Sequence, residues 1–278
     1  MSKQILVCLE GSASGKTAVE VAIGLAQELP AQLTGLAIVD EPDIRAGQAT
    51  PIGGAAYKAE RDEALVADAE AHARSWKETF LAHCRQARVE ARAVEVHGEA
   101  AAIILEESKT RDLVVLGRDA NFRFETAEED TRTREVLLHR ADGPVLIVPA
   151  ERVATGPGVL VCYDGTQASI RAIRAFARSG IAGERPVHVL TIGDSGEKAW
   201  MIAGQGAALL DEVGITATPR HIVSLLTTSD AILDQREKLD TGLIVMGAYA
   251  HSRFSRLLWG SVTKELLEKT VVPLFLHY

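Results

Sequence analysis

The sequence has few of the residues that mark secreted, metal-binding or membrane-spanning proteins. Its 278 residues include three cysteines, Cys8, Cys84 and Cys162, with no Cys-x-x-Cys spacing, so neither a disulfide framework nor a cysteine zinc site is indicated. Aromatic residues make up 5%, and no apolar run is long enough to span a membrane. The apolar stretch at residues 5–9 is too short for a signal-peptide core. We expect a cytoplasmic protein with no membrane partner.

The net negative charge of the chain argues against nucleic acid as a partner. Asp and Glu number 38 against 30 Lys and Arg, a formal charge of -8. Because nucleic-acid affinity depends mainly on cationic side chains that displace counterions, nucleic acid is not expected to bind. The eight histidines are scattered, and no metal site follows from them. A chain of this length that is 47% hydrophobic and 24% charged is typical of a globular protein with two domains.

The two halves of the chain resemble each other. Residues 4–12 align with 158–166, and each segment is an apolar run that ends in an acid, a glycine and a hydroxyl residue. Residues 112–117 match 242–247, and residues 143–148 match 272–277. The repeat therefore covers whole domains, which we place at 1–150 and 156–278, with a linker at 149–157.

Strands and helices are predicted to alternate within each half. Apolar runs predict strands at 33–39, 89–96, 187–192 and 216–223, and helical spacing predicts helices at about 58–87, 99–109, 198–213 and 229–239. Residues 113–116 and 243–246 are continuously apolar, as in strands covered on both faces. We therefore predict an α/β fold: two repeated open parallel sheets of the Rossmann-like type with helices on both faces. Residues 40–57, rich in Gly, Pro and Ala, are interpreted as a loop, either a lid or, as we favour, a tolerated insertion.

The most informative segment lies between a buried strand of the second half and the helix that begins near Ser261. It runs from Gly247 to Val262 and resembles the signature of the universal stress protein family: glycine, two residues, glycine, nine residues, glycine, then serine or threonine. Residues 255–258 before Gly260 strengthen the resemblance. Ala250 stands where the family has its second glycine.

Physical chemistry favours an anion site in the same segment. The first backbone N–H groups of a helix are unpaired and lie at the positive end of its dipole, where phosphate binds readily. Ser261 is placed to cap the helix or to donate to a phosphate oxygen, and His251, Arg253 and Arg256 add donors and positive charge. The alternative is an ordinary helix start at Gly260 and Ser261 with Gly247 as a strand exit.

The family resemblance implies a set of nucleotide-binding residues. It implies that the acid after the first strand of the second half, Asp164, contacts the ribose or adenine, with backbone near Thr191 and Ile192 at the adenine edge. The alternative for Asp164 is a turn residue before Gly165. The complete set that we assign to the site is Tyr163, Asp164, Thr191, Ile192, Gly247, Ala250, His251, Arg253, Gly260, Ser261 and Val262.

The first half lacks these features. The alignment puts Asp130 and Thr131 where Gly260 and Ser261 stand, within an acidic run at 125–130, and Glu10 replaces Asp164. An unpaired carboxylate about 4 Å from a phosphate costs roughly 1 to 4 kcal/mol. We expect this half to bind ATP poorly or not at all, although a solvated loop is the alternative for the acidic run.

Two other features of the sequence invite a chemical interpretation. Residues 11–17 look like a phosphate-binding P-loop, but the spacing between Gly11 and Gly15 is one residue too short. A weaker anion remains an alternative there. Cys8 and Cys162 occupy equivalent places in the first strands and are interpreted as small core residues.

The sequence therefore predicts an ATP-binding stress-response regulator with no dedicated catalysis and at most slow hydrolysis. The alternatives are a weak ATPase or phosphotransfer enzyme on the same fold, and an interaction scaffold without a ligand. The ligand implied by the resemblance is ATP, with Mg²⁺ and the choice between ATP and AMP left open. The resemblance also implies domain pairing within the chain, through residues 144–148 and 273–277, and leaves a homodimer open.

Overall fold

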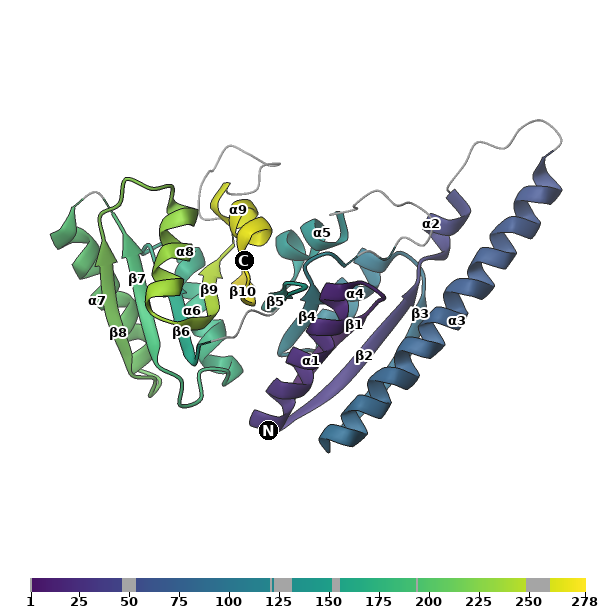
Figure 1. The fold of residues 1–278 in the computed structure, drawn as a ribbon, viewed down its shortest axis with the longest axis horizontal. Coiled ribbons are helices and arrows are strands. Elements are labelled where there is room, and N and C mark those ends of the chain that lie inside the picture. The colour runs from purple at the N-terminus through teal and green to yellow at the C-terminus, as the bar shows by residue number, and fades with distance from the viewer. Residues whose placement is uncertain are drawn as a thin grey trace. The chain divides into compact units, whose positions relative to one another are not determined.

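The computed structural model describes residues 2–46, 54–120, 122, 132–151, 156–193, 195–248 and 261–278. It divides into two compact units, residues 1–140 and 141–278. In each unit, helices pack against a sheet, and strands and helices alternate along the chain (Figure 1). The α/β fold with a mostly parallel sheet that the sequence predicts is confirmed.

The described residues of the first unit form four parallel strands in the order β3-β2-β1-β4. The strands are β1 (Lys3–Leu9), β2 (Ala31–Val39), β3 (Ala91–His97) and β4 (Leu113–Gly117). The helices are α1 (Ala13–Glu28), α2 (Glu41–Ala46), α3 (Ala55–Ala87), α4 (Ala100–Ser108) and α5 (Arg132–Arg140). Every residue of β4 is buried, as its continuous apolar run predicts.

In the second unit, the part of the chain that the structure describes forms six strands in the order β5-β10-β9-β6-β7-β8. They are β5 (Val145–Val148), β6 (Gly158–Cys162), β7 (Val187–Ile192), β8 (Ala217–Ile222), β9 (Thr241–Gly247) and β10 (Leu274–His277). The helices are α6 (Gln167–Ser179), α7 (Gly196–Asp211), α8 (Thr228–Lys238) and α9 (Ser261–Lys269). Helices α8 and α9 lie on one face of this sheet, and α6 and α7 lie on the other (Figure 1).

The last strands of the two repeats pair with each other, as the sequence predicts. Strand β5 runs antiparallel to β10, with Leu146 opposite Phe275, whereas the other pairs in this sheet are parallel. Strand β5 closes the first repeat of the sequence yet belongs to the second compact unit. The division into domains 1–150 and 156–278 stays a prediction.

Equivalent helices begin with equivalent caps. The hydroxyl of Ser12 accepts a hydrogen bond from the Gly15 N–H at the start of α1, and the hydroxyl of Thr166 accepts one from Ser169 N–H at the start of α6. These bonds satisfy backbone donors that the first turn of a helix leaves unpaired. Gly180 ends α6 in the left-handed conformation, with φ of 78°.

The interpretation of residues 40–57 as one loop is wrong. Residues 41–46 form α2, and residues 55–57 belong to α3, while 47–53 lie outside the described residues. Helix α2 is only six residues long, so its own backbone hydrogen bonds are too few to stabilise it. Contacts between α2 and the rest of the unit supply the stability that the short helix lacks by itself.

Candidate functional site

The candidate site lies at the carboxyl ends of β6, β7 and β9 in the second unit. Strands β6 and β9 are hydrogen-bonded neighbours, with Val161 opposite Val245, so the loops that follow them start from adjacent positions. The chain leaves β6 toward α6 on one face and enters α9 on the other after β9 (Figure 1). Such a point of divergence is where open α/β sheets bind their ligands.

Asp164 forms the turn between β6 and α6. Its Oδ1 accepts hydrogen bonds from the backbone N–H of Thr166 at 3.0 Å and from the Thr166 hydroxyl at 2.7 Å. Gly165 has φ of 80°, a conformation that glycine adopts without strain. Asp164 is exposed, and within the described residues its Oδ2 makes no hydrogen bond. One oxygen therefore shapes the turn, and the other remains available to a ligand.

Tyr163, Thr191 and Ile192 meet at the ends of two neighbouring strands. The Thr191 hydroxyl donates to the Tyr163 carbonyl at 2.7 Å, and Tyr163 is 5% exposed. Its ring packs against Gly206 of α7, where a Cβ would lie 2.7 Å from the ring, and burial followed by the charge of Asp164 raises the Tyr163 pKa. The side chains of Tyr163 and Thr191 are thus committed to the core. These residues therefore offer a ligand their backbone groups rather than their side chains.

Gly247 ends β9 against the first turn of α6. A Cβ at this position would lie 2.6 Å from the carbonyl carbon of Ala168 and 2.8 Å from the nitrogen of Ser169. Gly117, its counterpart at the end of β4, is equally close to α1, with a Cβ 2.6 Å from the nitrogen of Gly15. The glycine is therefore required by the contact between strand and helix. Sequence reasoning assigned Gly247 to the nucleotide site and did not anticipate this packing role.

The signature helix α9 begins at Ser261. Ser261 is exposed, Val262 is half-buried and Thr263 is buried, so the first turn presents Ser261 outward. Ala250, His251, Arg253 and Gly260, together with the other residues of 249–260, lie outside the described residues. The structure thus describes Ser261 and Val262 from the signature helix, and Gly247 from the strand before it.

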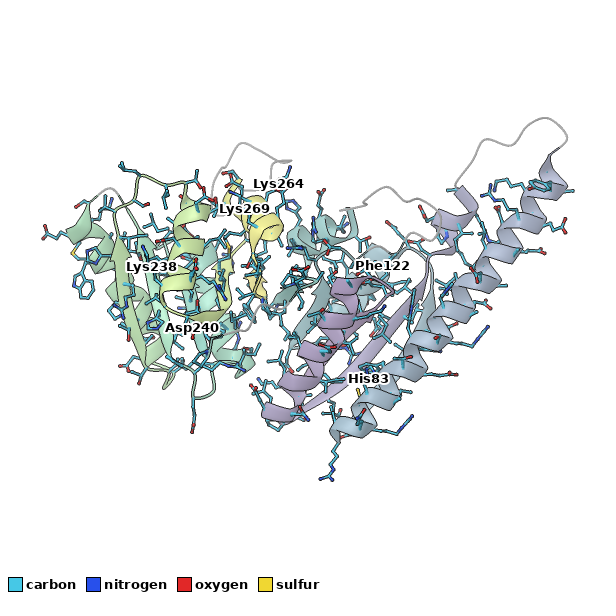
Figure 2. The ribbon with its side chains drawn as sticks, in the orientation of Figure 1. His83, Phe122, Lys238, Asp240, Lys264 and Lys269 are labelled. Carbon is cyan, nitrogen blue, oxygen red and sulfur yellow. The ribbon has the colours of Figure 1, made fainter. Side chains whose placement is uncertain are left out.

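A cation near the start of α9 was missed by the sequence reasoning. Lys264 is exposed on the first turn and points away from the helix (Figure 2). Lys264 lies three positions after Ser261, about one helical turn, and that spacing was the available signal. Farther along α9, Lys269 pairs with Asp230 of α8 at 2.8 Å, and Glu265 accepts a hydrogen bond from the Ser229 hydroxyl. These contacts fix α9 to α8.

The equivalent turn of the first unit holds a buried carboxylate. Glu10 is 6% exposed, and it accepts hydrogen bonds from the N–H and the hydroxyl of Ser12, both at 2.6 Å. Burial raises the pKa of Glu10, because a carboxylate loses solvation there. The two acids at equivalent positions therefore differ: Asp164 is open to solvent and Glu10 is enclosed.

Glu10 also accounts for the glycine in the P-loop-like segment. A Cβ on Gly15 would lie 2.0 Å from Glu10 Oε1, so a larger residue there would have to displace the carboxylate. The Ser14 hydroxyl accepts the Asp119 N–H at 2.9 Å, which joins the loop after β4 to α1. The space in this loop is filled by the protein's own carboxylate. The acidic run at 125–130 and Thr131 lie outside the described residues.

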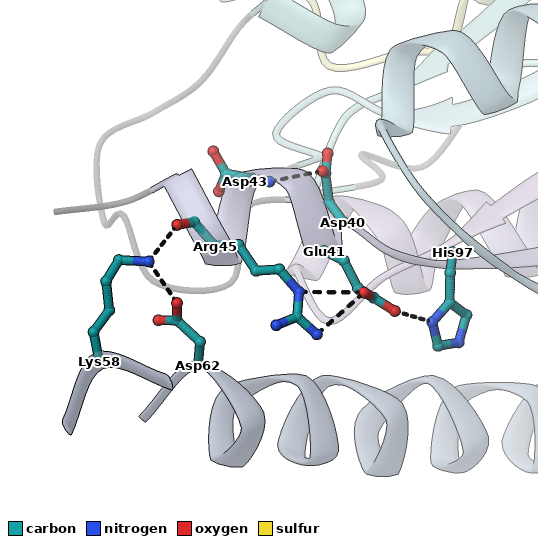
Figure 3. Close-up of polar contacts among 7 residues, drawn as sticks. All are labelled: Asp40, Glu41, Asp43, Arg45, Lys58, Asp62 and His97. Atoms are coloured by element: carbon teal, nitrogen blue, oxygen red, sulfur yellow. Dashed lines mark hydrogen bonds and ion pairs between the residues drawn. The ribbon is translucent and has the colours of Figure 1, made fainter. Parts of the chain in front are cut away.

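A polar cluster holds α2 at the carboxyl ends of β2 and β3 (Figure 3). Glu41 Oε1 and His97 Nδ1 are 2.7 Å apart, and Lys58 donates to the Arg45 carbonyl at 2.6 Å. Asp40 accepts from the N–H of Asp43 at 3.1 Å, and from the N–H of Ala100 in α4 at 3.0 Å. These contacts tie the short helix to β3, α3 and α4.

The comparison with protein families agrees with this architecture. The model of the universal stress protein family matches residues 1–149 and again residues 158–276. The chain belongs to the universal stress protein family. It carries two copies of the family's domain, and the resemblance based on residues 247–262 is confirmed at the level of the family.

Related proteins extend this result. Universal stress protein Slr1230 from Synechocystis is 29% identical over 168 residues, which cover 58% of this chain and 56% of that protein, so the match spans about half of each. A universal stress protein structure from Archaeoglobus fulgidus has a TM-score of 0.67 at 18% identity, covering 99% of this chain and 98% of that one. Protein PA1789 of Pseudomonas aeruginosa, described as functionally unknown, has a TM-score of 0.55 at 15% identity over 99% and 92%. These structures share the fold across the whole chain.

The described residues hold neither a membrane-spanning helix nor a cluster of metal-ligating side chains. None of their helices combines the length and apolarity needed to cross a membrane. No group of three or more His, Cys, Asp or Glu side chains in them is arranged to hold a metal ion. Burial raises the pKa of the Cys8 and Cys162 thiols, which suits unreactive core residues.

Proposed function

We propose that this universal stress protein binds one adenine nucleotide, ATP, in its second unit and acts as a nucleotide-responsive regulator without a catalytic step of its own. The observation that carries the proposal is the contrast between Asp164 and Glu10. At equivalent turns, Asp164 is exposed and one of its oxygens makes no hydrogen bond to the described residues, whereas Glu10 is buried and bonded to Ser12. Only the second unit leaves this acid accessible to a ligand.

The start of α9 supports the phosphate half of the proposed site. Ser261 is exposed on the first turn, and its neighbour Lys264 adds a positive charge. The unpaired N–H groups and the dipole of the helix favour an anion at this end. We propose that phosphate oxygens lie there and that the ribose or adenine lies toward Asp164 and the backbone of Thr191 and Ile192. Tyr163, Gly247, Ala250, His251, Arg253, Gly260 and Val262 complete the proposed set.

Isothermal titration calorimetry with ATP and AMP tests the proposal. Asp164→Asn keeps the acceptor for the turn but removes the charge, and we expect about tenfold weaker binding, which is about 1.4 kcal/mol. Ser261→Glu places a carboxylate at the helix start and is expected to weaken binding at least as much. Asp211→Ala, an exposed acid at the far end of α7, is the matched control and is expected to bind as the wild type does. Equal affinities in all four proteins would overturn the assignment.

An interaction scaffold is the second candidate, and a specific surface favours it. Large apolar side chains are exposed on α7 and on the loop after β8: Trp200, Met201, Val223, Leu225 and Leu226. The ring of Trp200 packs edge-on against His221 at 5.4 Å, which links α7 to β8. No heat and no thermal shift with nucleotide at millimolar concentration would favour the scaffold over the ATP site.

A further inference from the structure

Two arginines of the first unit converge on one threonine hydroxyl. Arg92 Nε donates to Thr34 Oγ1 at 3.2 Å, and Arg111 Nη1 donates to the same oxygen at 3.1 Å. Thr34 lies in β2 and is 1% exposed, and Arg92 is its partner in β3. Arg111 comes from the turn before β4, so three separate segments meet at this oxygen. Two guanidinium groups are therefore held next to each other around a neutral acceptor.

This cluster has more donors than acceptors. The side chain of Arg111 is 6% exposed, and its buried Nε has no hydrogen-bond partner among the residues that the structure describes. Thr34 Oγ1 accepts two bonds, and within the described part of the chain its own O–H has no acceptor. Unpaired donors in such surroundings are costly, because they have lost water without gaining a partner. What the cluster lacks is a group that brings acceptor atoms.

The cluster also has more positive than negative charge. Glu107 of α4 accepts from Arg111 Nη2 at 2.9 Å and is the one carboxylate paired with these arginines among the described residues. Arg92 is exposed and forms no ion pair in that part of the chain. Two cations against one anion leave a net positive charge, and an oxyanion would neutralise it while accepting several hydrogen bonds.

We propose that Thr34, Arg92 and Arg111 form a binding site for a small tetrahedral oxyanion, of which inorganic phosphate is the simplest. Because Arg111 is bonded to Glu107, the site lies on the face of the sheet that α4 covers. Arg92 and Glu107, which is 34% exposed, form its open side. The site is near the amino ends of β2 and β3, whereas the nucleotide site is proposed at carboxyl ends in the second unit.

The second repeat provides an internal comparison. Leu33 and Val187 are equivalent positions in the two repeats. The strand registers place Ala91 opposite Leu33 and Ala217 opposite Val187, so Ala91 and Ala217 are equivalent as well. The residue that follows is Arg92 in the first unit and Thr218 in the second. Likewise, Leu113 and Leu243 are equivalent, and Thr241 occupies the place of Arg111. Neither arginine has a counterpart, and the proposed oxyanion site belongs to the first unit alone.

Titration of the full chain with phosphate at constant ionic strength, with chloride as the balancing anion, tests the proposal. We expect the side-chain Nε–H resonances of Arg92 and Arg111 to shift with phosphate, and the midpoint of thermal unfolding to rise by about 2–4 °C. The resonances report on the first unit, so phosphate bound in the second unit does not confuse the result. Sulfate is expected to act like phosphate, and acetate to act weakly.

Three variants sharpen the test. Arg92→Ala is expected to abolish the response of the Arg111 Nε–H signal and to lessen the thermal shift, while Arg74→Ala, a matched change on α3 of an arginine that is 56% exposed, leaves both effects intact. Glu107→Gln removes the competing negative charge and is expected to tighten phosphate binding several-fold. The proposal is overturned if the Nε–H signals do not respond to phosphate, if chloride alone reproduces the response, or if Arg92→Ala retains it.

Discussion

Gly247 at the end of β9 faces the backbone of Ala168 in the first turn of α6, and a Cβ on Gly247 would lie 2.6 Å from the Ala168 carbonyl carbon. Backbone atoms on both sides of this contact cannot rotate away as a side chain can. The point at which the chain leaves β9 is therefore set by the packing of a strand end on a helix.

Replacing Gly247 with alanine is expected to destabilise the protein. The added methyl group has no space, and overpacking of this kind costs about 1–3 kcal/mol. Chemical denaturation measures the change. Gly204→Ala is the matched control, since Gly204 lies within α7 with nothing within 4 Å of its Cβ position, and alanine there should stabilise the helix by roughly 0.5–1 kcal/mol. Equal effects of the two substitutions would contradict the packing account.

Glu10 is expected to make stability fall as pH rises. Burial raises the pKa of Glu10, so the folded protein holds a proton that the unfolded chain releases at lower pH. The contribution of Glu10 to stability is complete below its ordinary pKa of 4.5 and is lost as pH rises through the raised folded pKa.

Glu10→Gln tests this expectation by unfolding at several pH values. The variant should be more stable than the wild type at neutral pH, and the difference should vanish below pH 4.5, where Glu10 is protonated. Glu20→Gln, an exposed change on α1, should show no such trend. A variant that is less stable at neutral pH would mean that the carboxylate's bonds to Ser12 outweigh the cost of its burial.

The pKa of His97 is raised, whereas burial alone lowers the pKa of a histidine. Its hydrogen bond to Glu41 raises the His97 pKa, and Glu95 and Glu70 add to the effect while partial burial opposes it. Lys77, which pairs with Glu95, and Arg45, which pairs with Glu41, are the nearby cations. The stabilisation is fully present below the ordinary pKa of 6.5 and is lost as pH rises through the raised folded pKa.

Hydrogen exchange of the α2 amides across this pH range measures the effect. Protection of α2 should decrease as pH rises above 6.5, after correction for intrinsic exchange, and His97→Gln should remove the dependence. The effect is expected to be small, because His97 and Glu41 are 38% and 31% exposed and solvent screens their attraction. His83→Gln, on the exposed face of α3, serves as the control (Figure 2). Unchanged protection in His97→Gln would contradict the role of the pair.

Local sequence patterns were sufficient to predict the architecture. The apolar runs at 113–116 and 243–246 lie in β4 and β9, and the acid-Gly-hydroxyl turns precede α1 and α6. Each such element depends on its own residues and on burial, so its sequence carries the signal. The pairing of β5 with β10 was implied by the family resemblance.

Features that depend on contacts between separate elements could not be predicted from local sequence patterns. Helix α2 is held by His97 and Lys58, which are far from it in the sequence, and a stretch rich in Gly and Pro gave no helical signal. The enclosure of Glu10 and the contact between Gly247 and Ala168 are products of packing between elements. The meeting of Arg92 and Arg111 at Thr34 likewise arises only when three segments come together.

The stoichiometry of nucleotide binding tests the central claim most directly. Calorimetric titration of the full chain with ATP should give one site per chain, and Asp164→Asn should weaken that site, while Glu10→Gln leaves it unchanged. Two sites per chain, or a single site that responds to Glu10 and not to Asp164, would contradict the account.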